Sequence, residues 1–106
     1  MQVLHYLDSR GHDVYQEWLD RLRDISGRVA IQRRIDRIAD TGNVGSHSFC
    51  QDGVWELKVD VGPGYRVYYI EIKKKSVLLL CGGSKRNQGR DIIKAVEYWK
   101  DYQKRL

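Results

Sequence analysis

Three side chains in one short stretch of the sequence have the chemistry to act on a phosphate. Lys58, Arg66 and Tyr68 are separated by even numbers of residues, in a stretch where apolar and polar residues alternate. This alternation predicts two strands of a hairpin whose even-numbered residues share one face. Two cations can hold a phosphate between them, and a phenol beside them can move a proton.

The turn of this hairpin sets its register. If Gly62, Pro63 and Gly64 form the turn, Asp60 faces Arg66 and Lys58 faces Tyr68. Lys58 and Arg66 are then diagonal neighbours, roughly 7–8 Å apart, which suits a shared phosphate. The same register predicts a core face made of Trp55, Leu57, Val59, Val61, Tyr65, Val67 and Tyr69.

A purely structural role fits the same spacing. Asp60 and Arg66 would then form a cross-strand ion pair, with Glu56 and Lys58 on a solvated sheet face. Exposed ion pairs of this kind are common and contribute only about 0–1 kcal/mol each. The spacing alone therefore leaves the phosphate site and the plain ion pair both open.

Positive charge is concentrated at the carboxyl-terminal end. The net charge is +5, and residues 73–106 hold ten Lys or Arg against three acids. Lys85 and Arg86 come where a strand gives way to a helix, a place where backbone N–H groups favour anions. Arg90 follows on the same helix, so this end is the expected polyanion-binding surface, although a solvated charged helix would look the same. The run 73–75 is expected to be a solvated turn.

The elements that must position these residues follow from periodicity and capping. Asp13, with Gln16 three residues later, predicts the start of a helix over 14–24, and Ser26 is expected to cap a second helix that ends at Gly42. The loop from Thr41 to Gly53 holds at most a short strand near 46–50. The remaining expected elements are a first strand at 3–7, hairpin strands at 55–61 and 65–72, an apolar strand at 77–81 and a final helix capped by Ser84 or Asn87. Together with the two helices they give the order β-α-α-β-β-β-α.

The apolar run from Val77 to Cys81 is expected to be a central strand covered on both faces and ended by Gly82 and Gly83. One α+β domain over residues 1–106 is expected, with an antiparallel-rich sheet packed against helices. No apolar stretch is long enough to cross a bilayer, and no signal peptide is recognisable, so a cytoplasmic protein is expected.

Cysteine and histidine usage predicts neither a disulfide nor a metal site. Two cysteines in a protein without an export signal are expected to be reduced. The three histidines are isolated from one another and from the cysteines, so no metal-ligand spacing is present and no cofactor is expected.

Three segments together resemble a known family. They are Gly53-Val54-Trp55-Glu56-Leu57-Lys58, Gly62-Pro63-Gly64-Tyr65-Arg66-Val67-Tyr68 and Leu78-Leu79-Leu80-Cys81-Gly82-Gly83-Ser84-Lys85. They are similar to the RelE/ParE superfamily of toxins, and specifically to its phage-related, HigB-like branch of addiction module killer proteins. The order of elements is also similar, so the resemblance covers nearly the whole chain and implies a RelE-like fold.

The resemblance implies the toxin of a type II toxin–antitoxin module that cleaves messenger RNA without a metal, usually on the ribosome, and so inhibits translation. Arg66 matches the phosphate-stabilising arginine of the family, and Lys58 matches one of its two strand lysines. Lys85 or Arg86 matches the basic residue after the glycine. The residues expected to bind RNA are Lys58, Arg66, Lys85, Arg86 and Arg90. The implied partner is a helix-turn-helix antitoxin. The toxin would contact operator DNA only through this antitoxin.

Two departures from the family pattern keep alternatives open. The second strand lysine falls on Glu56, and no tyrosine matches the carboxyl-terminal tyrosine of RelE, so Tyr68 is the substitute candidate by the register argument. A ParE-like inhibitor that binds DNA gyrase is the first alternative. A nontoxic module that binds nucleic acid or an acidic protein is the second.

Overall fold

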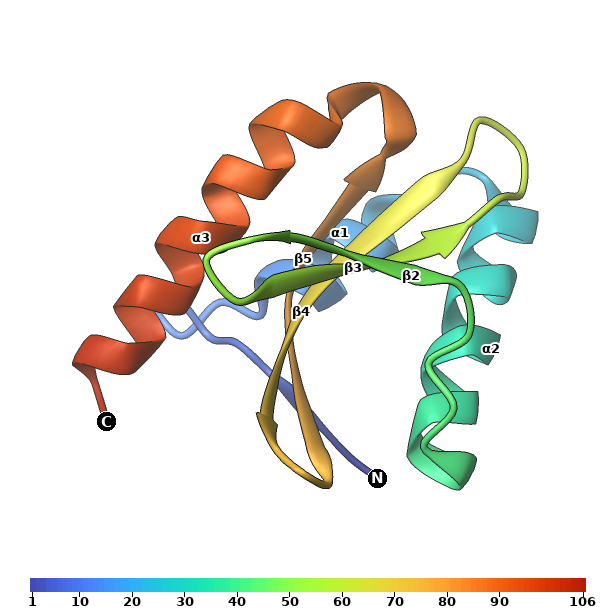
Figure 1. Ribbon diagram of the computed structural model, residues 1–106. Helices are drawn as coiled ribbons and strands as arrows, with labels where there is room; N and C mark the ends of the chain where they lie inside the picture. The colour runs from blue at the N-terminus through green and yellow to red at the C-terminus, as the bar shows by residue number, and fades with distance from the viewer.

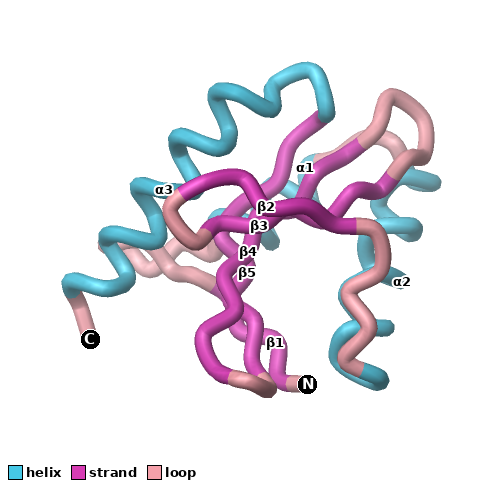
Figure 2. The backbone as a smooth tube through the Cα atoms, in the orientation of Figure 1, coloured by secondary structure: helices cyan, strands magenta, loops and turns pink.

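The structure is a computed structural model that describes all 106 residues. A strongly twisted sheet runs through the middle of the molecule, with α3 on one side of it and α1 and α2 on the other (Figures 1 and 2). The elements in chain order are β1 (Gln2–His5), α1 (Val14–Arg21), α2 (Ile25–Thr41), β2 (His47–Gln51), β3 (Val54–Val59), β4 (Tyr65–Lys73), β5 (Ser76–Ser84), a 3₁₀ turn η1 (Lys85–Asn87) and α3 (Gln88–Lys104).

The sheet has five strands in the order β1-β5-β4-β3-β2. Only β1 and β5 run parallel; the other three pairs are antiparallel. The expected α+β class, with an antiparallel-rich sheet against helices, is therefore confirmed. The expected order of elements lacked one strand, because the segment treated as loop with at most a short strand forms β2 at the sheet edge.

Two apolar clusters hold the layers together, one on each face of the sheet. The first joins α1 and α2 to the sheet through Tyr15, Leu19, Ile31, Ile35, Ile38, Leu57, Val59, Tyr65, Val67, Tyr69, Val77 and Leu79. The second joins α3 to the opposite face through Tyr6, Val54, Tyr68, Ile70, Leu78, Leu80, Cys81, Ala95 and Val96. Residues 77–80 of β5 alternate between the two clusters, which confirms that its apolar run is an interior strand covered on both faces.

The helix ends explain where the chain turns. Asp13 caps α1 as expected, accepting a hydrogen bond from the backbone N–H of Gln16 at 3.0 Å. The second cap was misplaced: Asp24, not Ser26, accepts the bond from the N–H of Gly27 at 3.0 Å. Gly42 ends α2 with a φ of 75°, the left-handed conformation that glycine adopts without strain.

Gly82 and Gly83 lie inside β5 and do not end it, contrary to the expectation. Each allows a close approach from a different layer. A Cβ at Gly82 would overlap the ring of Trp18 on α1, and a Cβ at Gly83 would overlap the carboxyl group of Asp91 on α3. The pair therefore lets helices on both faces contact the strand backbone directly.

The start of α3 differs slightly from the expectation. Ser84 and Asn87 do occupy the cap positions of η1 and α3, but neither side chain makes a capping hydrogen bond. The 3₁₀ turn between them carries Lys85 and Arg86, so these two basic residues stand before the helix proper.

Candidate functional site

The hairpin register places Lys58 directly opposite Arg66. The expected register was wrong by two residues, because the connection spans residues 60–64 and not only the Gly-Pro-Gly turn. Val61 consequently lies in the loop, 37% exposed, outside the core to which it was assigned. A shift of two keeps every strand residue on its expected face, so Lys58 and Arg66 still share one face, as direct rather than diagonal neighbours.

Arg66 is buried, with 5% of its side chain exposed. Its Nη1 donates to the backbone oxygen of Tyr65 at 2.9 Å and to Asp60 Oδ1 at 3.3 Å. Its Nε has no hydrogen-bond partner and lies 3.9 Å from Oε1 of Glu56. The Asp60–Arg66 ion pair considered from the sequence is therefore present, but Arg66 keeps an unused donor in a buried position.

Glu56 is the buried anion of the site, with 5% of its side chain exposed. Its two carboxylate oxygens accept bonds from Nε2 of Gln88 at 2.9 and 2.7 Å, and Oε1 also accepts from Oγ of Ser48 at 3.1 Å. The carboxylate is thus satisfied by neutral donors from α3 and β2, and Arg66 contributes to it through charge rather than through a hydrogen bond.

Tyr68 does not lie on an open face. Its side chain is completely buried in the cluster beneath α3, and its hydroxyl group has no hydrogen-bond partner. Burial, followed by the charges of Glu56 and Asp91, raises the pKa of Tyr68. The expectation of a solvated face was wrong, because α3 covers it and periodicity within the hairpin does not show where a distant helix packs.

Lys58 is half-buried and its backbone is held by α2. Nη1 of Arg34 donates to the carbonyl oxygen of Lys58 at 2.6 Å, and Nη2 donates to the carbonyl oxygens of Val44 and Ser46 at 2.6 and 2.9 Å. The N–H of Lys58 donates to the oxygen of Ser46 at 3.0 Å. Arg34 therefore fixes the end of β3, and with it the position from which Lys58 extends.

The remaining basic candidates lie at the same end of the sheet and are exposed. β3 ends, β4 begins and β5 ends there, since Arg66 pairs with Lys58 on one side and with Gly83 on the other. The N–H of Lys85 donates to the carbonyl oxygen of Gly64 at 3.0 Å, which joins η1 to the hairpin loop. Arg86 follows on η1 and Arg90 lies in the first turn of α3. This cationic end is defined as Lys58, Arg66, Lys85, Arg86 and Arg90.

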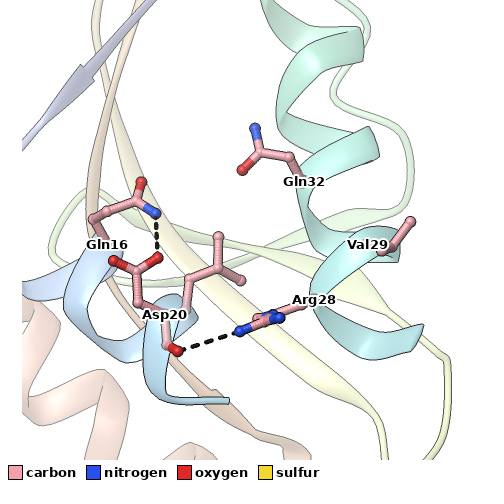
Figure 3. Close-up of a pocket in the computed structure, with 6 residues that line it drawn as sticks. Gln16, Asp20, Arg28, Val29 and Gln32 are labelled. Atoms are coloured by element: carbon pink, nitrogen blue, oxygen red, sulfur yellow. Dashed lines mark hydrogen bonds between the residues drawn. The ribbon is translucent and has the colours of Figure 1, made fainter. Parts of the chain in front are cut away.

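A separate hollow of about 250 Å³ lies between α1 and α2 (Figure 3). Gln16 donates to Asp20 within α1, and Arg28 of α2 donates to the backbone oxygen of Asp20 across the hollow. It belongs to the helical layer on the other face of the sheet and contains none of the residues of the cationic end.

The structure adds three facts about other kinds of site. It contains no group of three or more His, Cys, Asp or Glu side chains that could hold a metal ion. Both cysteines are free, and burial with the nearby Glu56 carboxylate raises the pKa of Cys50 to about 12. No helix combines the length and the apolar character that crossing a membrane requires.

Sequence reasoning missed three residues that shape the site: Arg34, Gln88 and Asp91. Arg34 and Gln88 belong to helices whose docking cannot be read from their own periodicity. Asp91 left a signal, because a glycine inside a strand, here Gly83, often marks the close approach of another group.

No family model matches the chain. A protein of Haemophilus influenzae, described as an uncharacterized protein, is 40% identical to it over 81 residues, which cover 76% of this chain and 81% of the Haemophilus chain. The chain belongs to the same family as that Haemophilus protein.

Proposed function

We propose that the protein is the toxin of a type II toxin–antitoxin module and acts in the cytoplasm by cleaving messenger RNA. The observation that carries this proposal is the cationic end of the sheet, where Lys58 stands directly opposite Arg66 and Lys85 is tied to the adjoining loop. The resemblance of the hairpin and of β5 to RelE/ParE toxins supports the same function.

The chemistry requires what this end of the sheet offers. In metal-independent cleavage the ribose 2′-hydroxyl attacks the adjacent phosphorus, and negative charge develops on the phosphate oxygens. Fixed cations stabilise that charge, and a guanidinium can contact two oxygens at once. Arg66 is held rigidly by Tyr65 and Asp60, so it is preorganised for this role, while exposed Lys85, Arg86 and Arg90 can bind the flanking RNA backbone.

Growth after induction of the protein alone tests the proposal. We expect the wild type to arrest growth and Arg66→Ala to relieve the arrest at equal protein level. Because Arg66 is buried, circular dichroism of the variant must show a folded protein. Lys58→Ala and Lys85→Ala remove more exposed cations and should each weaken the arrest without unfolding the chain. Full arrest by all three folded variants would refute the assignment of this site.

A ParE-like gyrase inhibitor remains the second candidate because of one observation. Glu56 stands buried beside Arg66 and brings negative charge to the place where a scissile phosphate would bind. A protein partner would tolerate that charge more easily than RNA would. DNA damage with intact transcripts after induction would favour this candidate, whereas cleaved transcripts would favour the nuclease. Harmless expression with no partner present would instead favour a nontoxic binding module.

A further inference from the structure

The carboxyl group of Asp91 takes the space of a side chain that β5 lacks. Asp91 lies in the first turn of α3 and is 8% exposed. Its Oδ2 reaches the bare backbone of Gly83, where any Cβ would overlap it. Gly83 is the cross-strand partner of Arg66. A row therefore crosses the sheet in the order Lys58, Arg66, Asp91, in which the carboxyl group stands where the neighbour of Arg66 would be.

This carboxyl group has no structural partner. Neither of its oxygens accepts a hydrogen bond, and it forms no salt bridge, whereas the nearby Glu56 has three hydrogen bonds. Four buried side-chain atoms of the protein lack a hydrogen-bond partner, and two of them lie in this region: Nε of Arg66 and the hydroxyl of Tyr68. Buried polar groups in native proteins are almost always paired, so two unpaired donors close to this free carboxyl group indicate a site arranged for a ligand.

We propose that Asp91 is the general base of the RNA cleavage reaction, an inference that rests on the proposed function. Its carboxylate takes the proton from the ribose 2′-hydroxyl, and the 2′-oxygen forms a bond to phosphorus. The bond from phosphorus to the 5′-oxygen breaks, and solvent water protonates that leaving oxygen, which leaves a 2′,3′-cyclic phosphate. Arg66 and Lys58 bind the non-bridging oxygens during this step.

The surroundings of Asp91 suit a base. Burial raises the pKa of Asp91, while Arg90 and Lys94 on its own helix lower it. The groups that face this region from the sheet are Arg66 and Tyr68 on β4, Glu56 on β3 and Cys81 on β5, whose Sγ contacts the Asp91 backbone oxygen at 3.9 Å. A carboxylate with a raised pKa accepts a proton more readily near neutral pH than an ordinary one does.

Substrate reaches this row when the side chain of Gln88 leaves Glu56 while the first turn of α3, which carries Asp91, stays in place. Arg66 is 4% and Asp91 8% exposed, and Gln88, which begins α3, ties that turn to Glu56 through two hydrogen bonds. The amide of Gln88 is neutral and its bonds can be exchanged with water, so RNA binding can open this contact. Binding and cleavage are therefore to be measured separately.

The test compares wild type, Asp91→Asn and Asp91→Glu in single-turnover cleavage of a messenger bound to ribosomes, from about pH 6 to pH 8.5. Glu97→Gln is the matched control, since Glu97 is an exposed carboxylate two turns further along α3. We expect Asp91→Asn to cleave about 100-fold more slowly with RNA binding unchanged, and to lose whatever rise of rate with pH the titration of Asp91 gives to the wild type. Asp91→Glu should recover part of the rate together with that rise, and Glu97→Gln should match the wild type.

The outcomes separate the inference from the proposed function. A wild-type protein that leaves the messenger intact would overturn the proposed function, and the inference with it. A wild type that cleaves, together with folded Asp91→Asn that cleaves within about threefold of it and with the same pH dependence, would overturn the inference alone. Loss of activity in Asp91→Asn without any recovery in Asp91→Glu, when both variants unfold at lower temperature than the wild type, would assign Asp91 a structural role and also overturn it.

Discussion

Glu56 and Arg66 are buried side by side on β3 and β4, with 3.9 Å between Oε1 and Nε. The carboxylate is hydrogen-bonded by Gln88 and Ser48, so the two charges compensate each other through space without a direct hydrogen bond. Tyr65 and Asp60 hold the guanidinium through its Nη1, and the separation from Glu56 leaves its Nε free.

Replacing Glu56 with Gln tests that compensation. The variant keeps the shape of the side chain but removes the negative charge beside a buried cation, so its free energy of unfolding should fall. Breaking a buried pair typically costs about 3–5 kcal/mol, and we expect about 2 kcal/mol because Asp60 still pairs with Arg66. Urea unfolding measures the change, with Glu97→Gln as an exposed control. Equal stability of wild type and variant would show that the pair contributes nothing.

Gly82 is predicted to be irreplaceable for a steric reason. An alanine there would overlap the ring of Trp18, and neither the β5 backbone nor the packed helix can yield easily. We expect Gly82→Ala to lower the free energy of unfolding by about 3 kcal/mol. Gly89→Ala is the matched control: no atom lies within 4 Å of a Cβ at Gly89 on α3, and the substitution should stabilise the protein by about 0.4–1 kcal/mol. Unfolding curves that rank the two variants the other way would contradict the packing.

The hydrogen bond between Tyr65 and Asp24 should make the stability of the protein depend on pH. A hydrogen bond from the hydroxyl of Tyr65 to Asp24 Oδ2 at 2.6 Å, together with the N–H of Gly27, lowers the pKa of Asp24. A carboxyl group with a lowered folded-state pKa contributes stability above its unfolded pKa and loses that contribution as the pH falls through the folded pKa. Tyr65→Phe should therefore have a lower free energy of unfolding than the wild type at neutral pH. The difference between the two proteins should become smaller as the pH falls. Urea unfolding at a series of pH values measures this difference. A difference in free energy of unfolding that does not change with pH would show that the bond does not involve the ionised carboxylate.

The exposed part of the cationic end is the expected contact of the antitoxin, for which an acidic segment has the complementary charge. Charge reversal at Lys85, Arg86 or Arg90 should weaken the complex about tenfold each, and added salt should weaken the wild-type complex. Lys100→Glu is the control, because Lys100 lies near the other end of the same helix. Binding that ignores both salt and charge reversal would point to an apolar contact instead.

Local signals in the sequence were sufficient to predict which face of the sheet each strand residue occupies. The period of two placed Leu57, Val59, Val67 and Tyr69 in one core, and an error of two residues in the register left that result intact. The cap at Asp13, the end at Gly42 and the burial of β5 were likewise local properties of the chain.

Tertiary packing decided the features that were not predicted. Asp24 prevailed over Ser26 as the cap because Tyr65, far along the chain, also bonds to it. The docking of α3 buried Tyr68 and placed Gln88 and Asp91 beside Arg66. Such contacts join residues distant in sequence, so periodicity and turn chemistry cannot reveal them.

Mapping of transcript ends shortly after induction tests the central proposal most directly. Cells that express the wild-type protein alone should show new 5′ ends within messenger RNAs, and cells that express folded Lys58→Ala or Arg66→Ala at the same level should show far fewer. Growth arrest with intact transcripts in the wild-type cells would contradict the nuclease and leave the gyrase inhibitor as the better account.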